Sequence, residues 1–189
     1  MLLKAERERY NRMPIVAWNF TFGDPDVEMP WPPLAIGQSL LRVYQPHIHD
    51  EIEIHQIRRG RVFAEICGQP LTLEPGDILI VNPWELHQGS IPDDIVTEYI
   101  HTTFLPDYFA GSCGAAGDVF RRLQAGELGF SNHLAADHPA AAEIGRTLDI
   151  IYAAYCAAAS GEVAETAADC RLASAASAMM AALLTSVPL

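Results

Sequence analysis

The stretch from Pro46 to His87 constrains the fold most, because it spaces three histidines and one glutamate in a specific pattern. It opens with PHIHDEIEIHQIRRG and closes with ILIVNPWELH. His47 and His49 are two residues apart, so on one β-strand both imidazoles project from the same face. Glu53 and His87 complete a set of four side chains that a small β-barrel can bring together.

Glycine and proline mark the turns within and after this stretch. Gly60 permits the positive φ of a tight turn, and Gly68-Gln69 indicates a second hairpin connection. Pro75-Gly76-Asp77 is a third turn signal. Short strands between such turns predict a barrel or sandwich rather than a βαβ fold. The expected strands are Ile15 to Phe22 and residues 38–46, 51–58, 62–67, 70–73, 78–82 and 95–104.

The four side chains are a donor set typical of transition-metal centres. Imidazole nitrogen and carboxylate oxygen suit divalent zinc, iron, nickel or manganese. Four such ligands leave one or two coordination positions open, as in catalytic or ligand-binding sites. Two interpretations stay open: His47, His49, Glu53 and His87 hold a metal ion, or they hydrogen-bond an organic ligand without one.

Four more residues are candidates for the same pocket. His55 continues the alternation of Glu53 and is expected to point into the barrel. Tyr99 and His101 alternate on the last expected strand, each as a ligand contact or as a core polar group with a local hydrogen bond. Trp84 either stacks on a ligand at the rim or caps the barrel end as a loop aromatic.

These motifs resemble those of the cupin superfamily. The matching positions are His47, His49, Glu53 and Gly60 for the first cupin motif, and Gly76, Asp77, Pro83 and His87 for the second. Two features depart from the pattern: Leu41 stands where the first motif usually has glycine, and no glycine lies between Pro83 and His87. The resemblance implies a cupin-type β-barrel, a double-stranded β-helix of the jelly-roll kind.

Within the cupins, the chain looks most like the N-terminal sensor domains of AraC-type transcription regulators, over roughly Leu40 to Phe104. That resemblance implies a small-molecule effector in the barrel and dimerisation through C-terminal helices. It also implies that DNA is bound by a further C-terminal domain, which this sequence does not contain. The expected parts are an N-terminal arm and first strand packing on the barrel (1–37), the barrel core (38–104) and a helical region (105–189).

Beyond Phe104 the sequence pattern changes from strands to helices. The expected helices cover residues 106–110, 118–124, 139–159 and 162–185. Ser160-Gly161 separates the last two, so they are expected to form an antiparallel hairpin. The apolar stripes at helical spacing are Ile144, Leu148, Ile151 and Tyr155 in the third helix, and Leu172, Ala176, Met179 and Leu183 in the fourth.

Met180 and Leu184 extend the apolar surface of the last helix, which is rich in alanine and serine. Because small residues permit close helix approach, we expect a homodimer through the C-terminal helices.

The charge and the cysteines exclude several classes of protein. The formal net charge is −12, with one lysine and eleven arginines, and no basic patch offers a nucleic-acid surface. We expect neither a secretory signal nor a membrane-spanning segment, because the given sequence has no apolar run long enough for either. Its four cysteines lack C-x-x-C spacing, which indicates free thiols in the cytoplasm.

The favoured function is an effector-binding and dimerisation domain of an AraC-type regulator. No catalytic residue is assigned, because the sequence contains no nucleophile elbow and no phosphate-binding glycine loop. Two alternatives stay open: a stand-alone metal-dependent cupin enzyme, an isomerase or a dioxygenase, and a sugar-binding cupin without catalysis. The C-terminal hairpin weighs against the enzyme, because a minimal cupin enzyme does not need it.

Overall fold

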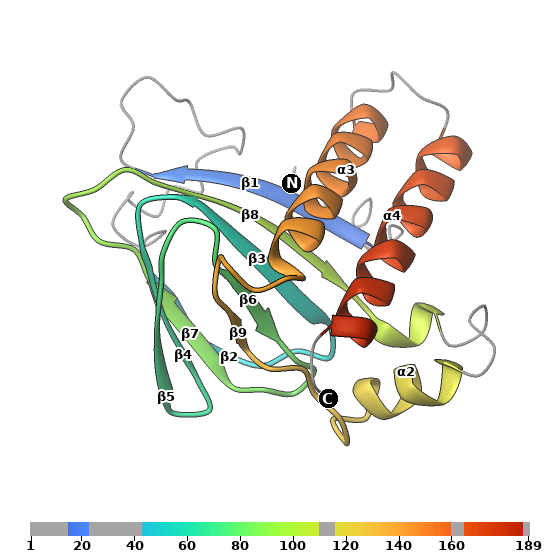
Figure 1. Cartoon of the computed structure of the whole chain (residues 1–189), viewed down its shortest axis with the longest axis horizontal. Coiled ribbons are helices and arrows are strands. Elements are labelled where there is room, and N and C mark those ends of the chain that lie inside the picture. The colour runs from blue at the N-terminus through green and yellow to red at the C-terminus, as the bar shows by residue number, and fades with distance from the viewer. Residues whose placement is uncertain (1–14, 23–42, 110–115, 160–164, 187–189) are drawn as a thin grey trace, which may run out of the picture.

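The computed structural model describes residues 15–22, 43–109, 116–159 and 165–186. They form two antiparallel sheets with a helical layer on one side (Figure 1). The five-stranded sheet runs in the order β1 (Ile15–Phe22), β8 (Thr97–Phe104), β3 (Ile52–Arg59), β6 (Ile78–Val81) and β9 (His133–Leu134). The four-stranded sheet runs β2 (Val43–His47), β7 (His87–Ser90), β4 (Val62–Ile66) and β5 (Gln69–Leu73). This architecture confirms the predicted cupin-type barrel with C-terminal helices.

Strand β3 is central to the fold, because it pairs with β8 on one side and β6 on the other. Its side chains alternate between two environments. Ile52 and Ile54 belong to the apolar cluster that the helices cover, whereas Ile57 belongs to a second cluster inside the barrel. The five-stranded sheet is thus buried on both faces around β3, and this one strand separates the helical layer from the barrel interior.

The predicted turns carry the expected backbone conformations. Gly60 joins β3 to β4 with φ +76°. The next hairpin turns at Cys67-Gly68, one residue earlier than predicted, with φ +50° and +80°. Two successive positive φ values characterise the type I′ turn, whose twist matches that of the strands it joins.

Several strand boundaries differ from the prediction. Residues 38–42 of the predicted second strand, and the predicted N-terminal arm before Ile15, lie outside the described residues. Strand β7 was not predicted, because its sequence HQGS lacks β-branched and aromatic residues. Its strand conformation comes from pairing with β2 and β4. Strand β9 lies within the predicted helical region and pairs with β6.

The helices follow the prediction closely. They are the 3₁₀ helix η1 (Pro106–Phe109), α2 (Gly117–Gln124), α3 (Ala141–Ala159) and α4 (Glu165–Ser186). Helices α3 and α4 pack as an antiparallel pair against the five-stranded sheet (Figure 1). The predicted stripes on both helices are buried, which confirms the face that each helix turns toward the core. Among the described residues, no helix combines the length and apolar composition needed to cross a bilayer.

Met180 and Leu184 do not form the exposed apolar surface that was expected for a dimer interface. Met180 is only 1% exposed and belongs to the core cluster that α3 and the five-stranded sheet share. Leu184 is partly buried against the same cluster. Helical periodicity could not show this, because α4 buries more of its circumference than the single predicted stripe. Neither residue extends a free apolar surface.

Replacing Gly60 by alanine should destabilise the fold much more than replacing Gly68. At Gly60 a Cβ atom would lie 2.4 Å from the Val96 carbonyl oxygen and 2.8 Å from the Thr97 Cα, whereas at Gly68 it would meet nothing within 4 Å. We expect Gly68→Ala to cost about 1 kcal/mol for its positive φ. Gly60→Ala should cost about 3 kcal/mol, because overpacking adds about 2.

Urea denaturation of both variants measures the two costs. Equal losses of stability would show that the contact between Gly60 and the 96–97 backbone does not constrain this turn.

Candidate metal and ligand site

Four predicted side chains meet at one end of the barrel. His47 is the last residue of β2, Glu53 lies near the start of β3, and His87 is the first residue of β7. His49 lies beyond the end of β2, so the alternation of a single strand does not bring its ring beside that of His47. The turn that leads into β3 carries His49 back toward the others. The ring centroid of His87 is 4.1 Å from that of His47 and 4.8 Å from that of His49.

One nitrogen from each histidine and one oxygen of Glu53 lie within 4.8 Å of one another. The Nδ1 atoms of all three rings are held by backbone carbonyls. His47 donates to Gln45 O at 2.8 Å, and His87 donates to Glu85 O at 2.8 Å. His49 Nδ1 lies 3.1 Å from Glu51 O. Since a carbonyl only accepts, Nδ1 carries the proton in His47 and His87, and Nε2 of each of these two neutral rings presents a lone pair. His49 Nε2 instead faces the Glu53 carboxylate.

The Nε2 atom of His87 shows that these residues fit a metal ion. It is buried and has no hydrogen-bond partner among the described residues. An unpaired buried polar atom costs stability, and a cation at the lone pair would remove that cost. A second ring nitrogen that donates to a carbonyl is the usual support of a metal-binding histidine, because it fixes the tautomer and the ring orientation. The donor set therefore fits a transition-metal cation.

Glu53 is the negative charge of the site. Its Oε2 atom lies 3.1 Å from His49 Nε2, and its Oε1 atom accepts a hydrogen bond from His55 Nε2. Burial raises the pKa of Glu53, but the charge of His55 and the hydrogen bonds of His49 and His55 outweigh burial. The net pKa of Glu53 lies well below its usual value, so the carboxylate is ionised at neutral pH.

The histidine pKa values reflect the same balance. Burial lowers the pKa of His49, but its hydrogen bond to Glu53 and the charges of Glu53 and Glu51 raise the net value. Burial lowers the pKa of His87. Burial also lowers the pKa of His101, to about 4, so this ring is neutral at neutral pH. Among these three histidines, only His49, which contacts the carboxylate, has a raised pKa.

Three further candidate site residues line a second layer of the cavity, deeper in the barrel than these four residues. His55 on β3 lies directly opposite His101 on β8, with ring centroids 4.8 Å apart. The Tyr99 ring lies 5.3 Å from that of His55. All three line one cavity of about 120 Å³, together with His47, Glu53 and His87. His49 is not among the lining residues, but its Nε2 atom contacts the carboxylate of Glu53, which is.

Trp84 is placed differently. Its indole N–H donates to Gln124 O at 2.8 Å, at the C-terminal end of α2. The indole is about half exposed and does not belong to the described residues that line the cavity. Of the two roles left open for Trp84, the structure supports the loop aromatic that ties the barrel end to a helix.

Sequence reasoning missed the apolar part of the cavity. Ile57, Val62, Leu73 and Leu79 line it, and all four are buried. Ile57 carried a signal, because it continues the alternation of Glu53 and His55 along β3. The other three come from β4, β5 and β6, and no local pattern connects them.

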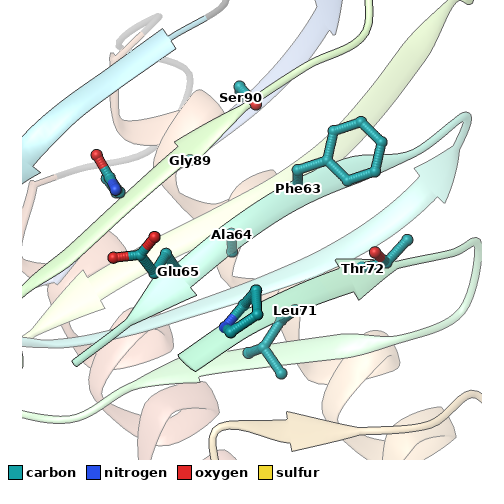
Figure 2. Close-up of a pocket in the computed structure, with 9 residues that line it drawn as sticks. Phe63, Ala64, Glu65, Leu71, Thr72, Gly89 and Ser90 are labelled. Carbon is teal, nitrogen blue, oxygen red and sulfur yellow. The ribbon is translucent and has the colours of Figure 1, made fainter. Parts of the chain in front are cut away.

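A second, open hollow of about 370 Å³ lies across the outer face of the four-stranded sheet. Figure 2 shows Phe63 and Glu65 from β4, Thr72 from β5 and Ser90 from β7 along it. None of the predicted site residues lines this hollow.

A sequence profile described as the AraC-like ligand binding domain matches residues 38–178, which include all eight candidate residues. The chain belongs to this family. No curated protein matches the chain.

Solved structures similar to this AraC-like domain are distant. Salicylate 1,2-dioxygenase from Pseudaminobacter salicylatoxidans is 16% identical, with a TM-score of 0.36, over 48% of this chain and 22% of that chain. An RmlC-like cupin from Shewanella frigidimarina is 18% identical, with a TM-score of 0.35, over 48% and 65% of the two chains. A predicted oxalate decarboxylase from Thermotoga maritima is 21% identical, with a TM-score of 0.31, over 33% and 55%. The domain covers less than two thirds of each.

Replacing Trp84 by phenylalanine should lower the free energy of unfolding by about 1 kcal/mol, because Gln124 O loses its indole donor. Metal uptake should not change, since the indole does not line the cavity. Urea denaturation and elemental mass spectrometry measure the two effects. Lost metal uptake at unchanged stability would instead place Trp84 in the site.

Proposed function

We propose that this AraC-like domain binds a small-molecule effector in its barrel, beside a divalent cation held by His47, His49, Glu53 and His87. Family membership supports the effector. The observation that carries the metal proposal is the convergence of three carbonyl-oriented histidines on one buried carboxylate. Zinc, iron, nickel and manganese all accept these donors.

Different residues would orient the metal ligands and contact the effector. The carbonyls of Gln45, Glu51 and Glu85 fix the three rings, and Glu53 offsets part of the cation's charge. When bound, the cation would supply a Lewis acid that holds an oxygen atom of the effector. His55, Tyr99 and His101 would contact the effector from the second layer.

Strand β3 offers a route from the cavity to the helices. It carries Glu53 and His55 on its cavity face, while Arg58 points to α3. The Arg58 guanidinium donates to Asp149 Oδ1 at 2.6 Å and to Gly145 O at 3.3 Å. An effector that prefers one position of β3 would therefore also bias the position of α3.

We further propose that the domain works in the cytoplasm as the sensor of a transcription regulator whose DNA contacts lie outside it. The net charge of −12 supports DNA binding elsewhere, since this domain would repel phosphates. Cys67, Cys156 and Cys170 are exposed and not disulfide-bonded, which supports a reducing compartment. A homodimer through the C-terminal helices completes the proposal, with Ile150 on α3 as the exposed apolar residue available for it.

Metal content tests the proposed centre directly. Protein purified without chelators should carry about one equivalent of a transition metal by elemental mass spectrometry. His87→Ala and Glu53→Gln should each weaken metal binding at least ~10-fold, and metal should raise the melting temperature of the unaltered chain.

His133→Ala is the matched control, because His133 lies on β9 outside the cluster. Protein that takes up no added metal, or a His87→Ala variant that binds it as tightly, would exclude the centre.

The dimer is tested by changing Ile150 to glutamate. Ile150 is 57% exposed on α3, so a charge there should not disturb the core, yet it should weaken a helix-mediated dimer at least ~10-fold. Phe63→Glu, on the outer face of the four-stranded sheet, is the control and should leave the dimer intact. Sedimentation velocity measures both. A monomeric unaltered chain at micromolar concentration would refute the dimer.

A further inference from the structure

The cavity changes from polar to aliphatic along the barrel, and β3 shows the order. Glu53, His55 and Ile57 point into it one after another. On the neighbouring β8, His101 lies opposite His55 and Tyr99 lies opposite Ile57. One end of the cavity thus carries the carboxylate, the imidazoles follow it, and the other end carries Ile57 beside the Tyr99 ring.

Four aliphatic side chains form one wall of the cavity. Ile57, Val62, Leu73 and Leu79 come from four different strands, belong to one packed cluster and are each at most 6% exposed. Hydroxyl groups placed against this wall would lose their hydrogen bonds to water without gaining others, which is unfavourable. A hydrocarbon chain would gain from burial there. The wall therefore selects an effector with an apolar end and disfavours sugars.

The volume limits the size of the effector. The cavity measures about 120 Å³. An engineered protein cavity of about 150 Å³ accommodates benzene, so roughly six non-hydrogen atoms fill the space available here. A hexose has about twice as many.

The charge at the polar end selects the head group. A divalent cation bound by the Glu53 carboxylate keeps one net positive charge, and only 12% of the Glu53 side chain is exposed. A single carboxylate neutralises that charge, whereas an amide or alcohol of the same size does not. Without the cation, Glu53 would repel a carboxylate.

We infer that the effector is a short-chain aliphatic monocarboxylate, with its carboxylate at the cation and its chain against Ile57, Val62, Leu73 and Leu79. This inference rests on the proposed metal-assisted sensing function and narrows it to one class of ligand. The inference excludes a sugar as the effector, an alternative that the sequence left open.

Co²⁺-loaded protein provides the test, because the visible absorption of Co²⁺ reports a new oxygen ligand. After metal content is measured, the protein is titrated with butyrate, butyramide, hexanoate and glucose, and its melting temperature is followed in parallel. Butyrate should change the Co²⁺ spectrum and raise the melting temperature. Butyrate should bind at least ~10-fold tighter than butyramide, because butyramide lacks the negative charge. It should also bind ~10-fold tighter than hexanoate, whose chain is too long for the cavity.

Two isoleucines of β3 give a matched pair of variants. Ile57→Val removes one methylene from the cavity wall and should shift the preference at least ~3-fold toward hexanoate. Ile54→Val makes the same chemical change on the face turned to the helices and should leave the preference unchanged. Both variants should take up Co²⁺ like the unaltered chain.

The outcomes separate this inference from the metal centre. Protein that takes up Co²⁺ but responds to none of the four compounds, or prefers glucose, overturns the inference and leaves the metal centre standing. Equal affinity for butyrate and butyramide, or butyrate binding by metal-free protein, overturns the role given to charge. Protein that takes up no Co²⁺ overturns both proposals.

Discussion

The buried carboxylate of Glu53 is the interaction on which the site depends. Only 12% of its side chain is exposed, and both of its oxygens face histidines. Removing an ion from water costs several kcal/mol. At 3.1 Å and an effective dielectric constant of about 20, attraction to a protonated His49 returns roughly 5 kcal/mol. The pair alone therefore roughly balances its own desolvation, while a divalent cation would attract the carboxylate about twice as strongly.

The position of Glu53 on β3 connects this electrostatic centre to the rest of the fold. Its strand neighbours Ile52 and Ile54 are packed beneath the helices, so the carboxylate cannot move without moving core residues. Arg58 on the same strand binds Asp149 of α3. Because close-packed elements shift as units rather than deform continuously, β3 is the strand through which the proposed effector would act on the helices.

Side chains of the two sheets complete one another around the cavity. The four-stranded sheet contributes His47, His87 and the wall residues Val62 and Leu73, and the five-stranded sheet contributes Glu53, His55 and His101. Polar groups gather where β2, β7 and the start of β3 meet, and the aliphatic side chains come from β3, β4, β5 and β6. The proposed effector site would use this arrangement to bind a charged group beside Glu53 and an apolar group against the aliphatic side chains.

The sequence by itself determined the barrel, the helical hairpin, the turn at Gly60 and the inward direction of Glu53 and His55, because these depend on short-range periodicity and on glycine's backbone freedom. Tertiary structure alone decided the rest. The sequence HQGS became strand β7 only because β2 and β4 supply its hydrogen bonds, and Met180 is buried because α4 packs against α3 and β1. The tautomers of the three histidines and the bond from Trp84 to Gln124 likewise depend on where particular backbone carbonyls lie. Such contacts join residues far apart in the chain or fix exact orientations, and neither composition nor spacing carries that information.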